Sequence, residues 1–145
     1  MNASDPIALA GKILIAEDNA AMRQMLAALC RDWGAIVIEC ANGTEAVEAY
    51  AWHQPDWVLM DFAMPIMDGL VATARIKREF PAARILIVTD YDSEALRQAA
   101  REAGASGFVR KEDLAELPAK LLALKDPSVP SDPISLALPA KEKSL

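Results

Sequence analysis

The chain has 145 residues, and 53% of them are hydrophobic, which is enough for one sizeable core but too few for two ordinary domains. Its formal net charge of -6 and its lack of any lysine and arginine run argue against direct nucleic-acid binding, so we expect protein partners. Cys30 and Cys40 lack the spacing of a zinc site, and no signal peptide or membrane span is recognisable, so we expect a cytoplasmic protein without membrane contact.

Short β-branched runs alternate along the chain with longer segments in which apolar residues recur every three or four positions. Strands are predicted at 12–16, 35–40, 57–60, 84–88 and 107–110, and helices at 20–33, 43–53, 69–80, 93–103 and 117–125. The strands are mostly apolar throughout, which is typical of a parallel sheet buried on both faces. We therefore predict an α/β fold with a doubly wound five-stranded parallel sheet and helices on both faces.

The domain organisation follows from where this alternation begins and ends. We predict an N-terminal extension at 1–11, one domain at 12–125, and a Pro-rich tail or linker at 126–145. The apolar stretch at 134–138 either docks on the domain or a partner, or has no role.

Polar residues follow four of the predicted strands. The first strand is followed by Glu17 and Asp18, the third by Asp61, the fourth by Thr89 and the fifth by Lys111. Because ligands of parallel sheets bind beyond the carboxyl ends of the strands, we expect these side chains to converge. Crowded carboxylates require a proton or a cation, and oxygen ligands favour Mg²⁺. A cation, an ammonium group and a hydroxyl beside a nucleophilic carboxylate are suited to phosphoryl transfer.

A simpler interpretation exists for part of this set. Acidic residues after a strand often cap the next helix, and either Asp18 or Asn19 is a candidate cap for the helix that begins at residue 20. Capping does not account for five polar residues at the ends of four strands, so the set as a whole favours a site.

Four stretches carry a family resemblance: ILIAEDN (13–19), PDWVLMDFAMPIMDG (55–69), ILIVTD (85–90) and GASGFVRKEDL (104–114). With these motifs, residues 12–125 resemble the receiver domain of two-component response regulators, which has a flavodoxin-like (CheY-like) fold. The resemblance implies a phosphoacceptor signalling domain rather than an enzyme. It also implies that a sensor histidine kinase or histidine phosphotransfer protein supplies the phosphoryl group.

The resemblance implies a role for each site residue. Asp61 would be the phosphoacceptor, and Lys111 and Thr89 would contact the phosphoryl oxygens. The implied Mg²⁺ ligands are three carboxylates and one backbone carbonyl, from Glu17, Asp18, Asp61 and Ala63.

The resemblance also implies a switch. Phe108 resembles the aromatic residue that turns inward with the threonine, although it is equally interpretable as a core residue. The surface expected to change is formed by the fourth helix, fifth strand and fifth helix, which is also the face that a homodimer would use. Whether a dimer forms is left open by the sequence. The positions of Tyr91 and Ala63 tune dephosphorylation in the family, and we expect slow loss of the phosphoryl group.

Two positions depart from the common family pattern. Lys111 is followed by Glu112 where proline is common, and Thr89 is followed by Asp90 where a small residue is common. Asp90 either repels the incoming phosphoryl group or points to solvent. Both features are similar to receivers of the NarL and LuxR type, which are usually joined to a helix-turn-helix domain. The chain is therefore either a stand-alone receiver or the receiver of a longer regulator.

Three other functions fit parts of the pattern less well. A haloacid-dehalogenase-like phosphatase needs an acidic residue where this chain has Ala63. A nucleotide or flavin binder needs a Gly-rich loop where this chain has Glu17, Asp18 and Asn19. A degenerate receiver, acting only as an interaction surface, is kept open by Asp90 and Glu112.

Overall fold

The computed structural model describes residues 11–125. Its sheet contains β1 (Gly11–Ala16), β2 (Ala35–Cys40), β3 (Trp57–Met60), β4 (Ile85–Thr89) and β5 (Gly107–Arg110). All neighbouring strands are parallel and follow the order β2-β1-β3-β4-β5, which is the flavodoxin-like order. The predicted doubly wound parallel sheet is therefore confirmed. The tail predicted at 126–145 and residues 1–10 lie outside the described residues.

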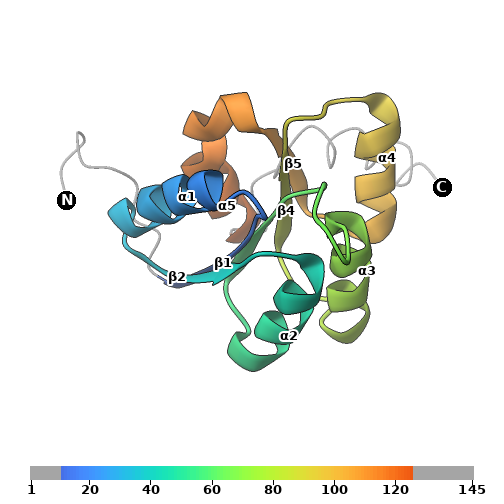
Figure 1. Ribbon diagram of the computed structural model, residues 1–145, viewed down its shortest axis with the longest axis horizontal. Helices are drawn as coiled ribbons and strands as arrows, with labels where there is room; N and C mark the ends of the chain where they lie inside the picture. Colours follow the sequence, from blue (N-terminus) through green and yellow to red (C-terminus); the bar gives the residue numbers. More distant parts are fainter. Residues whose placement is uncertain (1–10, 126–145) are drawn as a thin grey trace.

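Helices cover both faces of this sheet (Figure 1). They are α1 (Ala20–Asp32), α2 (Gly43–His53), α3 (Gly69–Glu79), α4 (Glu94–Ala103) and α5 (Leu117–Lys125), with the 3-10 helix η1 (Lys111–Glu116) before α5. The sequence did not predict η1, which begins at the lysine that proline commonly follows in the family. Between residues 11 and 125, no helix combines the length and the apolar character that crossing a bilayer requires.

Successive strand residues alternate between two separate halves of the core. Ile13 and Ile15 of β1 pack against α1 and α5, whereas Leu14 and Ala16 belong to the half covered by α2, α3 and α4. Trp57 is buried, and its Nε1 donates a hydrogen bond of 2.8 Å to the carbonyl oxygen of Leu121, which ties α5 to the sheet. Burial on both faces explains why the central strands are apolar throughout.

The capping contacts at the helix N-termini show which polar residues have a structural role. Asn19 caps α1, because its Oδ1 accepts a hydrogen bond of 2.8 Å from the backbone N–H of Met22. Of the two candidate caps for this helix, Asp18 is thus left available for another role. Asp68 caps α3 in the same way, accepting from the backbone N–H groups of Leu70 and Val71.

Candidate functional site

The carboxyl ends of β1 and β3 bring three carboxylates together. Sheet hydrogen bonds continue one residue past each strand, from Glu17 N to the Cys40 oxygen and from Asp61 N to the Ala16 oxygen, both at 3.0 Å. One carboxylate oxygen from each of Glu17, Asp18 and Asp61 lies within 4.8 Å of the others. Strand order reverses between β1 and β3, so this cluster occupies the point where ligands bind in open parallel sheets.

Lys111 reaches the same cluster from the end of β5. Its Nζ lies 2.7 Å from Oε1 of Glu17 and 3.5 Å from Oδ2 of Asp61. The structure therefore brings together four of the predicted site residues, and the ammonium group of Lys111 contacts two of the three carboxylates. The remaining negative charge favours a bound proton or cation.

Hydrogen bonds hold both the side chain and the backbone of Glu17 in place. It is 1% exposed, and its Oε2 accepts a hydrogen bond of 3.1 Å from the backbone N–H of Asn19. Arg23 of α1 donates from Nη1 to the backbone oxygen of Glu17 at 2.8 Å. The first turn of α1 thus fixes both the carboxylate and the chain that carries it. No sequence signal indicated this role for Arg23.

The electrostatics of the cluster disfavour the charged form of Asp61. Burial, and then the negative charge of Glu17, raise the pKa of Asp61 from 3.8 to about 7, although Lys111 opposes this shift. Burial alone would lower the pKa of Lys111, but its hydrogen bond to Glu17 and the charges of Asp61, Glu17 and Asp90 outweigh burial and raise it. Lys111 therefore stays protonated, and Asp61 is the carboxyl of the cluster at which a proton and a cation compete.

Thr89 and Ala63 lie at the same edge of the sheet. Thr89 is the buried last residue of β4 and pairs in register with Arg110, the residue before Lys111. Its hydroxyl accepts a hydrogen bond of 3.2 Å from the backbone N–H of Tyr91. Ala63 is exposed in the loop that follows Asp61. The predicted strand at 84–88 extends to Thr89, so the sheet itself positions this hydroxyl.

Gly69 allows the loop after Asp61 to fold back closely. The backbone N–H of Gly69 donates to the carbonyl oxygen of Phe62 at 2.9 Å. A Cβ atom at this position would overlap the backbone oxygen of Asp61. The sequence motif contains this glycine, but only the close approach of the two backbones shows why a side chain is excluded.

Aromatic residues lie close in sequence to Asp61, Thr89 and Lys111. The rings of Phe62 and Tyr91 meet edge to face, with centroids 6.2 Å apart. Phe108 is 2% exposed and belongs to the core, while the guanidinium carbon of Arg97 lies 4.5 Å from its ring centroid. Phe108 thus has the packing expected of a core residue, and its contact with a cation of α4 could not be predicted from sequence spacing.

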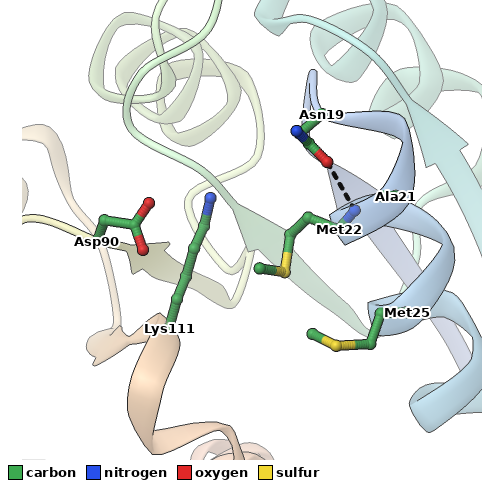
Figure 2. Close-up of a pocket in the computed structure, with 6 residues that line it drawn as sticks. All are labelled: Asn19, Ala21, Met22, Met25, Asp90 and Lys111. Atoms are coloured by element: carbon green, nitrogen blue, oxygen red, sulfur yellow. Dashed lines mark hydrogen bonds between the residues drawn. The ribbon is translucent and has the colours of Figure 1, made fainter.

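A pocket of about 360 Å³ opens beside the cluster. Figure 2 shows Asp90 and Lys111 on one side of it and Met22 and Met25 of α1 on the other. Asn19 and Ala21 complete the lining. A molecule that enters the pocket from solution would reach Lys111, whose ammonium group contacts Glu17 and Asp61.

The sequence of residues 13–122 matches the family described as the response regulator receiver domain. The chemotaxis protein CheY of Halobacterium salinarum is 38% identical over 103 residues, which cover 71% of this chain and 86% of that protein. The transcriptional regulatory protein PdtaR of Mycobacterium tuberculosis is 42% identical over 103 residues, which cover 69% of this chain and 49% of that protein. The chain thus spans most of CheY but only about half of PdtaR.

Solved structures show the same fold. A two-component response regulator of the LuxR family from Aurantimonas has a TM-score of 0.78 and 31% identity, with 94% of this chain and 100% of that chain covered. The receiver domain of the sensor histidine kinase PA1611 from Pseudomonas aeruginosa has a TM-score of 0.72 and 28% identity, covering 78% of this chain and 95% of that chain. That structure has a magnesium ion coordinated in its active-site cleft.

Proposed function

This chain belongs to the response regulator receiver domain family, and from that premise we propose that Asp61 is the residue on which it accepts a phosphoryl group in two-component signal transduction. The observation that carries the proposal is the meeting of Glu17, Asp18 and Asp61 within 4.8 Å at one edge of the sheet, with Lys111 in contact with two of them. Asp61 has the chemistry of the acceptor, because a carboxylate is an established covalent nucleophile for phosphorus.

The donor set of the cluster fits Mg²⁺. All three side chains offer only carboxylate oxygens, the ligands that this ion prefers, and Asp18 is exposed, so the cluster is open to solvent. Glu17, Asp18, Asp61 and the backbone carbonyl of Ala63 would hold the ion. When bound, Mg²⁺ would neutralise charge on the phosphoryl oxygens.

Asp61 performs the transfer in one displacement. An Asp61 carboxylate oxygen forms a bond to phosphorus as the bond between phosphorus and the donor's imidazole nitrogen breaks, and the imidazole keeps that electron pair. Lys111 holds a positive charge beside the acceptor, and Thr89 offers a hydroxyl at the end of the adjacent strand. The chain acts by positioning and charge neutralisation, which supply most of the catalysis in phosphoryl transfer.

The output of the phosphorylated chain is a change at the face formed by α4, β5 and α5. The loop after Thr89 connects it to this face. Asp92, three residues after Thr89, pairs with Arg97 of α4 at 2.8 Å and with Arg110 of β5 at 3.6 Å. Arg97 in turn covers Phe108. A local shift at Thr89 therefore alters contacts on the face through which a homodimer would form.

The partners follow from the same chemistry. The phosphodonor is a sensor histidine kinase or a histidine phosphotransfer protein, and the chain itself does not bind nucleic acid, in agreement with its net charge of -6. We place the protein in the cytoplasm, because both of its cysteines are free, buried thiols, as is usual in a reducing compartment. It promotes its own phosphorylation and loses the group slowly.

Phosphorylation by a small donor tests the proposal. The purified chain is incubated with Mg²⁺ and acetyl phosphate and examined by intact mass spectrometry. We expect the mass of one added phosphoryl group, stable in acid and labile in base, which chelation of Mg²⁺ prevents. Asp61→Asn should gain nothing, whereas Asp68→Asn, which keeps the α3 cap, should react as the wild type does. A phosphorylated Asp61→Asn variant, or an unmodified wild type, would refute the assignment.

A further inference from the structure

Asp90 is an exposed carboxylate at the mouth of the site. It lines the pocket beside Lys111 and forms no ion pair with any residue in the described range 11–125. Asp92 in the same loop differs, because Arg97 and Arg110 both pair with it. Of these two aspartates, Asp90 interacts with Lys111 only at longer range, so more of its negative charge acts on a molecule that enters the pocket.

Neighbouring cations are already engaged elsewhere. Lys111 contacts Glu17 and Asp61 with its ammonium group, and Arg110 pairs with Asp92 and Asp113. One lysine and one divalent cation carry three positive charges, which equal the three negative charges of the carboxylate cluster. The charge of Asp90 is then left over, and an incoming donor meets a negative pocket entrance.

Resting on the proposed phosphorylation of Asp61, we propose that Asp90 selects phosphodonors by charge and slows the reaction of small, doubly negative donors such as acetyl phosphate. Coulombic repulsion grows with the product of the charges, so a dianion is disfavoured more than a monoanion of similar size. Of the two possibilities left open by the sequence, repulsion is thus favoured over a side chain that only points to solvent.

Two small donors of different charge separate this effect from a steric one. Acetyl phosphate is a dianion at neutral pH, whereas phosphoramidate carries one net negative charge. Asp90→Asn keeps the size of the side chain and removes its charge. We expect phosphorylation by acetyl phosphate to become about three- to tenfold faster, and phosphorylation by phosphoramidate to change by less than about threefold, as expected for exposed charges in water. Asp90→Glu should keep the wild-type ratio of the two rates.

Glu79→Gln is the matched control. The first residue of α3, Gly69, lies against the Asp61 backbone, whereas Glu79 is exposed at the opposite end of this eleven-residue helix. The substitution makes the same change in net charge away from the pocket and should leave the ratio unchanged. Added salt should shrink the difference between wild type and Asp90→Asn, because screening weakens repulsion between exposed charges.

The possible outcomes are distinct. If Asp90→Asn accelerates both donors equally, or neither, the proposed selectivity is wrong while the phosphorylation of Asp61 stands. Equal effects of Glu79→Gln and Asp90→Asn would also overturn it, since net charge rather than the pocket would be responsible. If neither donor phosphorylates the wild type on Asp61, the proposed function fails, and this inference fails with it.

Discussion

The two edges of the sheet use the same kinds of charged residue in opposite ways. At the edge where the strands begin, the Asp56 carboxylate accepts a hydrogen bond of 2.9 Å from the Lys12 backbone, and the Lys77 ammonium donates to the carbonyl oxygens of Pro81 and Ala83 at 2.6 and 3.0 Å. At the edge where the strands end, three carboxylates lie close together, and Lys111 contacts two of them, Glu17 and Asp61.

This difference separates stabilising from functional charge. At the first edge, backbone groups form hydrogen bonds with the charged side chains of Asp56 and Lys77, so these side chains contribute to the stability of the fold without a ligand. At the second edge, burial and then repulsion from Glu17 raise the pKa of Asp61, and a proton or a cation relieves this repulsion. Four substitutions test this contrast, and they are described in order of decreasing expected effect.

Gly69→Ala should have the largest effect, because its Cβ would overlap the Asp61 backbone oxygen and displace the loop that carries the acceptor. We expect a loss of about 3 kcal/mol in the free energy of unfolding. Gly34→Ala is the control: its φ of 95° disfavours a side chain, but no atom lies within 4 Å of the added Cβ, so a loss of about 1 kcal/mol is expected. Urea denaturation measures both, and equal losses would contradict the steric explanation.

Asp61→Asn should stabilise the metal-free protein at high pH. The pKa of Asp61 rises from 3.8 to about 7 on folding, so the stability that its protonated form contributes is complete below pH 3.8 and is lost as the pH rises through 7. Asparagine does not ionise and avoids this loss. The full shift corresponds to about 4 kcal/mol. Relaxation and hydration around the ionised carboxylate offset part of this cost, so we expect the variant to be about 2 kcal/mol more stable than wild type at high pH, with a difference that disappears in acid.

Urea denaturation in the presence of a chelator, from pH 4 to pH 8, measures this difference. Addition of Mg²⁺ should reduce it, because the ion binds the wild-type cluster and compensates the same charge. A stability difference that does not vary with pH would show that ionisation of Asp61 does not destabilise the folded protein.

Lys77→Met should cost about 1 kcal/mol, because the carbonyl oxygens of Pro81 and Ala83 lose their ammonium donor. The variant should still be phosphorylated by acetyl phosphate at the wild-type rate. The same substitution at the other edge, Lys111→Met, should instead slow phosphorylation strongly. Similar phosphorylation rates for the two variants would remove the distinction between the edges.

Tyr91→Ala should have the smallest effect. Tyr91 is 57% exposed and packs edge to face on Phe62, the residue after Asp61, and we predict that it shields the phosphoryl group from water. We expect the phosphorylated variant to lose its phosphoryl group a few-fold faster, which intact mass spectrometry over time after donor removal measures. Ile36→Ala removes an exposed side chain from the edge strand β2 and serves as the control. An unchanged lifetime in Tyr91→Ala would exclude shielding.

Much of the site was predictable because the relevant signals are local. Each strand is an apolar run, and the polar residue that ends the run must lie at the carboxyl edge of a parallel sheet, so Glu17, Asp61 and Lys111 could be grouped from the sequence alone. Positions that depend on contacts between distant segments were not predictable. These include the stacking of Arg97 on Phe108 and the bond from Arg23 to the Glu17 backbone.

The sequence by itself determined the order of strands and main helices and the identity of the polar residues at the strand ends, since periodicity and strand termination are properties of neighbouring residues. Only the tertiary structure decided that Asn19 caps α1 while Asp18 joins the cluster, that Glu17 is buried, and that Asp90 lines the pocket beside Lys111. The physical reason is that burial and charge pairing depend on which segments meet in space, and side-chain type does not encode that.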